Sequence, residues 1–279
     1  MKKEFFKKGL PFALILSLTL GMAALTGCSS STNASKEASA ENPRKVVIGT
    51  GTQFKPYCYL DESGNLAGYE LEVLKEIDNR LPQYEFDFET FDFKNILLSL
   101  GDGKVDIGAH QFEKNPDREA SYLFGTESYT TFILRIVVDK DRTDINGIDD
   151  LQGKTVEVSE GSNDAWVLED YNKKHQDNPI KLKYISNSDA VAQIQELEDG
   201  RIDAAISIKR IVDSWNKTYG DKVKTAGDPI ASSSTYYIYR KDDTQLQQDI
   251  DAVLKELKED GTLAQISIDV LGGDYTTTD

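Results

Sequence analysis

Hydrophobic residues in the body of the chain recur at two different spacings in turn, one typical of short strands and the other typical of helices. KVVIGTG at 45–51 is a β-branched run that ends in glycine, and YEFDFETF at 84–91 alternates aromatic and acidic residues as a half-buried strand does. The segment 69–81 has leucine and isoleucine at helical spacing, and a second helical pattern at 93–100 precedes the strand KVDIGAH at 104–110. Strand, helix, strand, helix and strand at short intervals predict a parallel α/β lobe.

The same order of elements recurs further along the chain. The pattern predicts strands at 154–162, 181–186 and 201–207, with helices at 163–175 and 189–200 between them. A second α/β lobe is therefore expected after the first.

A short internal repeat supports two related lobes. LGDGKVDI at 100–107 and LEDGRIDA at 197–204 share leucine, aspartate, glycine, a basic residue, an aliphatic residue and aspartate. One such match is weak because helix–glycine–strand junctions look alike, but the whole order of elements agrees with it. The remaining block, a strand at 234–241 and helices at 243–260 and 262–273, is too small for a domain. We expect it to pack on one of the lobes.

The first 27 residues differ from this body. MKKEFFKKG is basic, LPFALILSLTLGMAAL is an apolar run of about signal-peptide length, and LTGCSS follows. A small residue before a lone cysteine resembles the lipobox of bacterial lipoproteins, which implies cleavage before Cys28 and a lipid on its sulfur. The alternative is an uncleaved membrane anchor with an incidental cysteine. The Ser-rich segment 28–42 is then a flexible tether.

Composition and charge narrow the functional classes. The 279 residues, 39% of them hydrophobic, suffice for two packed lobes. A formal net charge of −16 argues against nucleic acid as a partner, since such binding depends on cationic side chains. It also repels an anionic bilayer, so membrane attachment has to come from the lipid. Once Cys28 is modified, Cys58 has no disulfide partner, and its aromatic neighbours favour a small buried residue over a reactive thiol.

The sequence lacks the motifs of catalysis and cofactor binding. His110 and His175 have no metal-ligand spacing with each other or with Cys58, and neither GxSxG nor GxxxxGK[ST] occurs. GTGTQF has two glycines of a dinucleotide fingerprint, but Phe54 at the third position would block close helix–strand packing. We therefore expect no metal, no cofactor and no enzymatic activity.

Polar and aromatic residues follow several of the predicted strands. Ligands of parallel sheets bind at the carboxyl ends of the strands, and a helix that begins there offers backbone N–H groups to a carboxylate. Arg118 could hold the same carboxylate with its planar guanidinium group. The strand-end residues are Phe54, His110, Gln111, Ser162 and Asn163.

Five segments stand in a specific order and spacing over the body of the chain, about residues 44–272: GTGTQFKPYCYLDESGNLAGYELEVLKEI, GDGKVDIGAHQFEKNPDREASYLFGTESY, DDLQGKTVEVSEGSN, DGRIDAAIS and LKELKEDGTLAQI. With these segments the chain resembles the extracellular solute-binding proteins of ABC importers, in their polar amino-acid branch. The resemblance implies an α/β fold of two lobes joined by two hinge strands, which close around a small-molecule amino acid. Lobe I would comprise 43–130 and 234–279, and lobe II 131–233. It also implies a monomer that docks on an ABC permease and its ATPase.

The resemblance also implies which residues contact the ligand. Nine residues match the ligand contacts of the family. They form two aromatic walls, three polar positions after the third strand, a carboxylate-binding arginine and three positions in the second lobe. Each has a structural alternative, because the aromatics could be core, the arginine an exposed side chain, and the polar residues caps or satisfied strand ends. In chain order the matching residues are Phe54, Phe93, His110, Gln111, Glu113, Arg118, Ser162, Asn163 and Asp164.

One position departs from the family pattern. Ile208 stands where relatives place an aspartate that pairs with the α-ammonium of the ligand. An enclosed ammonium without a counter-charge costs on the order of several kcal/mol. Either Glu113, Asp164 or Glu160 substitutes for that aspartate, or the ligand lacks an ordinary α-amino group.

The segment HQFEKNPDREASYLF resembles most the binders of cystine and other sulfur amino acids. Cystine is therefore the first candidate ligand, and a basic or polar amino acid is the next. Two other functional classes remain. Related folds host a dehydratase of cyclic acids, for which His110 or Glu113 could supply the general acid. A sensor lipoprotein that binds the same ligand is the other.

Overall fold

The computed structural model describes residues 39–186 and 189–277, which belong to one compact unit, Ala38–Asp279. The predicted signal peptide, Cys28 and most of the predicted tether lie outside the described residues. The strands are β1 Arg44–Thr50, β2 Gln53–Phe54, β3 Cys58–Leu60, β4 Leu66–Ala67, β5 Tyr84–Thr90, β6 Ile107–Glu113, β7 Leu123–Phe124, β8 Thr130–Asp139, β9 Thr155–Ser159, β10 Lys181–Ile185, β11 Ala204–Ile208 and β12 Val223–Tyr239. The helices are α1 Tyr69–Arg80, α2 Phe93–Gly101, α3 Pro116–Ser121, the 3-10 helix η1 Ile148–Leu151, α4 Asn163–Lys174, α5 Ala190–Glu198, α6 Lys209–Tyr219, α7 Thr244–Glu259 and α8 Thr262–Leu271.

One large sheet organises these elements, with the strand order β10-β9-β11-β8-β12-β6-β1-β5 and β7 added beside β12. β1 pairs in parallel with β5 and β6, and β9 pairs in parallel with β10 and β11. We call the strands β1, β5 and β6 with their helices the β1 half, and β9, β10 and β11 with theirs the β9 half. Each half is thus a parallel α/β layer of the kind that the hydrophobic pattern predicted.

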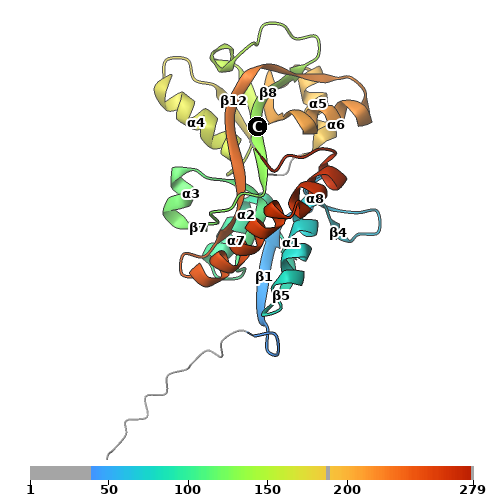
Figure 1. Cartoon of the computed structure of the whole chain (residues 1–279). Coiled ribbons are helices and arrows are strands. Elements are labelled where there is room, and N and C mark those ends of the chain that lie inside the picture. The colour runs from blue at the N-terminus through green and yellow to red at the C-terminus, as the bar shows by residue number, and fades with distance from the viewer. Residues whose placement is uncertain (1–38, 187–188, 278–279) are drawn as a thin grey trace, which may run out of the picture. The chain divides into compact units, whose positions relative to one another are not determined.

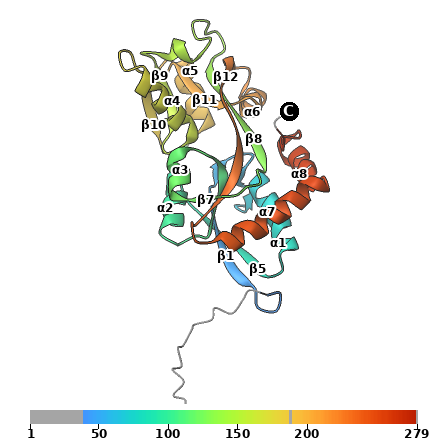
Figure 2. The ribbon, with the colours of Figure 1, turned by 60° about the vertical axis from the view of Figure 1, so that its left-hand side comes forward.

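Two long strands run between the halves. β8 pairs with β11 on one side and with β12 on the other, and β12 continues past β8 to pair with β6. Figures 1 and 2 show both strands extending from the helices of the β9 half to those of the β1 half. The sequence predicted only 234–241 for β12, which in fact spans 17 residues with an irregular register between Ala226 and Ala231.

Helices cover both halves. α1, α7 and α8 pack on one another in the β1 half, and α2 packs on β1 and β6 (Figure 1). In the β9 half, α4 packs on β9, α5 packs on β11, and α6 packs on β11, β8 and β12. α7 has an apolar stripe that is fully or almost fully buried: Leu246, Ile250, Val253 and Leu257. The C-terminal helices therefore belong to the β1 half, although the chain reaches them from the β9 half.

The internal repeat marks the same junction in both halves. The Asp106 carboxylate accepts the backbone N–H of Val47 at 2.8 Å, and the Asp203 carboxylate accepts that of Thr155 at 2.8 Å. Each aspartate therefore ties the start of one parallel strand to the neighbouring strand. The shared residues have equivalent structural roles.

Candidate functional site

A cavity of about 360 Å³ is lined by residues from both halves of the sheet. The β1 half contributes the loop after β1, the end of β6 and α3, and the β9 half contributes the ends of β9 and β11 and the first turn of α4. All nine residues proposed from the sequence line this cavity: Phe54, Phe93, His110, Gln111, Glu113, Arg118, Ser162, Asn163 and Asp164. That they contact a solute stays a prediction.

Three rings form an aromatic wall of the cavity. His110 stacks parallel on Phe54 with ring centroids 5.2 Å apart, and the Phe93 ring lies 4.9 Å from His110 on another side. Burial lowers the pKa of His110 to about 4, so this imidazole is neutral at neutral pH. Gly51 permits the packing, because a Cβ there would come within 2.5 Å of His110 Nε2.

Arg118 is buried between the halves, so the alternative of an exposed surface arginine is wrong. Asn115 caps α3 by accepting the backbone N–H of Arg118 at 2.9 Å. The guanidinium donates to the backbone carbonyl of Glu113 at 2.9 Å and to that of Gly161 at 2.8 Å. Burial lowers the pKa of Arg118, and the nearby carboxylates of Glu113 and Asp164 oppose this shift. The cation is thus oriented by two neutral acceptors, one in each half.

Two carboxyl groups face the same space. Glu113 is 5% exposed and accepts a hydrogen bond from the Ser233 hydroxyl of β12. Burial raises the pKa of Glu113 to about 7, against the opposing effects of Ser233 and Arg118. Burial also raises the pKa of Asp164, although a hydrogen bond with Ser162 opposes it. An incoming cation would favour the ionised form of either group.

The first turn of α4 supplies the polar groups of the β9 half. Ser162 caps this helix, since its hydroxyl accepts the N–H of Ala165 at 3.2 Å and donates to the Ser159 carbonyl at 2.6 Å. Asn163 accepts a hydrogen bond at 3.3 Å from Asn115 of the β1 half. Ser162 is therefore a helix cap that also lines the cavity.

Further bonds between the halves lie beside the cavity. Lys94 on α2 forms an ion pair with Glu160 at 3.0 Å, and the Trp166 indole donates to Asp117 at 3.2 Å. Together with the Arg118–Gly161 bond, they join the β1 half to the first turn of α4. Such bonds would have to break if the two halves separated.

Several residues that line the cavity were not anticipated from the sequence. α6 contributes Ile211, Ser214, Trp215, Thr218 and Tyr219, while β8, β9 and α5 contribute Phe132, Leu134, Glu157 and Gln193. The apolar residues of KRIVDSWNKTY recur at helical spacing, which could have revealed α6. Nothing local marks Glu157, which lies within a buried strand and accepts a hydrogen bond from Gln193 at 2.9 Å.

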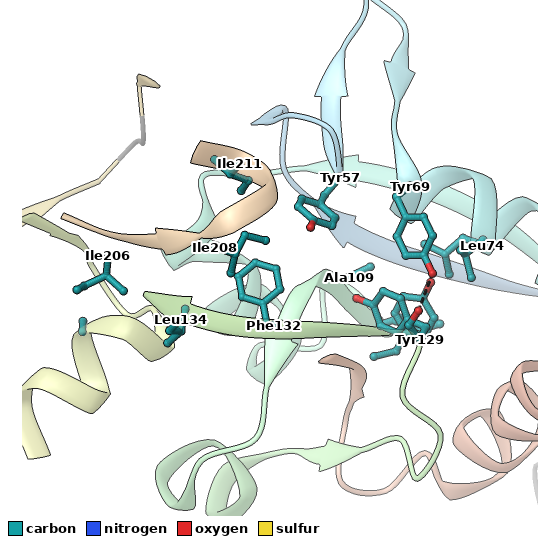
Figure 3. Packing of buried hydrophobic residues seen from close by; sticks show 14 of the residues in the cluster. Tyr57, Tyr69, Leu74, Ala109, Tyr129, Phe132, Leu134, Ile206, Ile208 and Ile211 are labelled. Carbon is teal, nitrogen blue, oxygen red and sulfur yellow. Dashed lines mark hydrogen bonds between the residues drawn. The ribbon is translucent and has the colours of Figure 1, made fainter. Parts of the chain in front are cut away.

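Ile208, the residue that departs from the family pattern, does not line the cavity. It is 2% exposed at the end of β11 and is paired in register with Leu134 of β8. Figure 3 shows it among Phe132, Leu134, Ile206 and Ile211 in an apolar cluster. Cys58 is also buried, and burial raises its pKa to about 12, as expected for a core residue rather than a reactive thiol.

Residues 46–272 match the family model of bacterial extracellular solute-binding proteins, family 3. The chain belongs to this family. The L-cystine-binding protein TcyK of Bacillus subtilis is 40% identical over 264 residues, which are 95% of this chain and 96% of that protein. A solved structure of a putative L-cystine ABC transporter protein from Listeria monocytogenes has a TM-score of 0.78 and 42% identity over 84% of this chain and 98% of that one. Another, described with glutathione import by GshT and the cystine importer TcyBC of Streptococcus mutans, has a TM-score of 0.77 and 30% identity over 84% of this chain and 97% of that one.

Membership of the solute-binding family confirms the predicted fold class and the choice of a binding protein over an enzyme. The family is extracellular, which gives the protein an extracytoplasmic location. Within residues 39–186 and 189–277, no helix is both long enough and apolar enough to cross a membrane. The lobe boundaries, the lipid on Cys28 and the monomeric state stay predictions.

Proposed function

We propose that the protein captures cystine, or another polar amino acid, between the lobes 43–130 plus 234–279 and 131–233. The closed form would then deliver the solute to an ABC permease driven by an ATPase. The observation that carries this proposal is Arg118, a buried guanidinium held beside two carboxyl groups in a cavity lined by both halves. Opposite charges this close suit a zwitterion. The similarity to cystine-binding proteins supports cystine as the first candidate.

Glu113 is the proposed partner of the solute's ammonium group. Glu160 does not line the cavity and is paired with Lys94, and Ile208 is apolar and buried elsewhere. In an α-amino acid the ammonium and the carboxylate share one carbon, so the ammonium's partner has to lie close to the arginine. The Arg118 guanidinium donates to the backbone carbonyl of Glu113 at 2.9 Å, which places this residue beside the arginine.

The β9 half offers polar groups for a second head group. Glu157 is 4% exposed, forms an ion pair with Lys183 at 3.1 Å and accepts from Gln193, and both Glu157 and Gln193 line the cavity. Ser207 lies on the same wall. Cystine has two amino-acid heads joined by an apolar disulfide linker, and an aromatic wall with polar groups on both sides suits that shape.

Calorimetric titration of the full-length protein in detergent with cystine and matched analogues tests this function. 3,3′-Dithiodipropionic acid lacks both ammonium groups of cystine, and cystamine lacks both carboxylates. We expect cystine to bind and both analogues to bind at least about a hundredfold more weakly, because each leaves buried charges unpaired. Equal binding of dithiodipropionic acid would instead mean that the ligand needs no α-amino group. Binding of arginine, glutamine or glutathione without cystine would replace the proposed solute.

The attachment proposed for this protein is a lipid on Cys28, with the body held as a monomer by the tether 28–42. The apolar run before Cys28 and the small residue in front of it support this proposal. We expect Cys28→Ser to abolish incorporation of radiolabelled palmitate in bacterial cells that process lipoproteins. Full labelling of that variant would rule out Cys28 as the modified residue.

A further inference from the structure

Gln111, one of the residues that line the cavity, has an unusual backbone conformation. Its φ angle is 53°, and among the described residues no other non-glycine residue has a positive φ. L-residues in the left-handed region lose on the order of 1 kcal/mol unless surrounding contacts favour that conformation. The side chain lines the cavity, so this conformation decides what Gln111 presents to a solute.

Glu70 holds both the backbone and the side chain of Gln111. One carboxylate oxygen, Oε1, accepts the backbone N–H of Gln111 at 2.7 Å and its side-chain N–H at 2.9 Å. The same oxygen accepts the hydroxyl of Tyr129 at 2.8 Å. Glu70 is 1% exposed in the first turn of α1 and does not line the cavity. It can therefore act on a solute only through Gln111.

The contacts of Glu70 extend to both strands that run between the halves. Tyr129 directly precedes β8, and its carbonyl accepts the hydroxyl of Tyr69 at 2.5 Å, as Figure 3 shows. Thr235 on β12 donates to the side-chain oxygen of Gln111 at 3.3 Å. In Figure 3, Tyr129 lies at the start of the strand that carries Phe132 and Leu134 toward the β9 half. The position of Gln111 is thus fixed relative to β8 and β12 as well as to α1.

Glu70 also has a buried oxygen that is unfavourable for stability. Its second oxygen, Oε2, is buried and has no hydrogen-bond partner among the described residues. An unpaired buried acceptor is unfavourable, and buried polar groups in proteins are usually satisfied. The other oxygen, Oε1, accepts three hydrogen bonds, which an apolar side chain in the same place could not do.

We propose that Glu70 is a positioning residue for solute binding, which holds Gln111 in its left-handed conformation and ties it to the strands β8 and β12. This inference rests on the proposed function, because it takes Gln111 as a solute contact. Glu70 itself touches no solute.

Titration of full-length Glu70→Gln with cystine at pH 8 tests the proposal. The amide oxygen is a weaker acceptor than a carboxylate, so we expect about tenfold weaker binding with an unchanged fold by circular dichroism. Tyr129→Phe, which removes one donor, is expected to weaken binding about threefold. Gln111→Gly relieves the positive φ and removes the side chain that Glu70 holds. In that background, adding Glu70→Gln should cause no further loss, as expected for coupled residues in a double-mutant cycle.

Asp251→Asn is the matched control. Asp251 is 7% exposed and accepts from the backbone and hydroxyl of Thr126 at 2.8 and 2.7 Å and from the backbone of Glu127 at 3.3 Å, but it does not line the cavity. Its replacement should lower the melting temperature and leave the cystine affinity within about twofold.

Three results would overturn the inference. The first is a cystine affinity of Glu70→Gln equal to that of the wild type. The second is a loss of affinity from Glu70→Gln that is just as large in the Gln111→Gly background. The third is a loss of affinity in Asp251→Asn as large as that in Glu70→Gln. A wild-type protein that binds no solute of the panel would instead overturn the proposed function, and this inference with it.

Discussion

Replacement of Arg118 by alanine is expected to weaken cystine binding by a hundredfold to a thousandfold. Loss of one partner from a buried, hydrogen-bonded charge pair costs about 2–5 kcal/mol, and each 1.4 kcal/mol is a factor of about ten in affinity. Arg118 also joins the two halves through its bond to the Gly161 carbonyl, and the variant loses this bond. Calorimetric titration of the full-length variant with cystine measures the effect.

Two further variants separate the role of Arg118 from a general loss of structure. Arg118→Lys keeps the charge but lacks the planar fork, so its affinity should lie between those of the wild type and the alanine variant. Arg135→Ala is the matched control, because Arg135 also donates to a backbone carbonyl, that of Gly227 at 3.1 Å, but does not line the cavity. An affinity within fivefold of the wild type for Arg118→Ala would refute a carboxylate-binding role.

The placement of the candidate residues could be predicted because the rule behind it is topological. Carboxyl ends of parallel strands meet at one edge within each half, so the residues after β1 and β6 converge, as do the residues after β9 and β11. The two halves run in opposite directions across the antiparallel strands β12 and β8, and both edges line the same cavity. β1 and β9 were identified from short β-branched runs that lead into glycine, and β6 from its place after the second predicted helix. All nine proposed residues line one cavity for this reason, whatever their individual roles.

The elements between the halves were harder to predict. FILRIVV in β8 is an apolar run that only Arg135 interrupts and that does not alternate, and β12 contains a polar stretch, ASSST, that local preference does not assign to a strand. Both are strands because each lies between two neighbours that satisfy its backbone. Such pairing depends on the three-dimensional arrangement, which local patterns do not encode.

Glu70 illustrates a second limit of sequence reasoning. An acidic residue in the first turn of a helix is usually exposed and stabilised by the helix dipole. Here the first turn of α1 faces β6, and the residue is completely buried beside three tyrosine side chains, Tyr69, Tyr129 and Tyr237. Burial of a charge is decided by packing between distant segments, so neither its spacing nor its neighbours in the sequence reveal it.

Replacement of Glu113 by glutamine is expected to weaken cystine binding about a hundredfold at pH 8. A neutral amide leaves the solute's ammonium without a counter-charge in a buried site, at a cost of about 2–5 kcal/mol. Asp164→Asn, which neutralises the other carboxyl group near Arg118, is the matched control and should have a smaller effect. If Asp164→Asn causes the larger loss, the ammonium's partner is Asp164 and the proposed assignment is wrong.

Glu113→Gln is also expected to change how the cystine affinity depends on pH. The pKa of Glu113 in the free protein is raised to about 7, and an adjacent ammonium favours the ionised form, so binding releases a proton wherever Glu113 begins protonated. Wild-type affinity should therefore fall at least about tenfold from pH 8 to pH 6, with release of at least about one proton per solute at pH 6. Titrations in buffers of different ionisation enthalpy count that proton. Glu113→Gln should keep only the part of the pH dependence that comes from Glu70, whose pKa burial also raises to about 7. Adding Glu70→Gln should reduce the change in affinity to less than about threefold over this range, because both groups are then neutral at every pH. A pH dependence that persists unchanged in Glu113→Gln would show that another group takes up the proton.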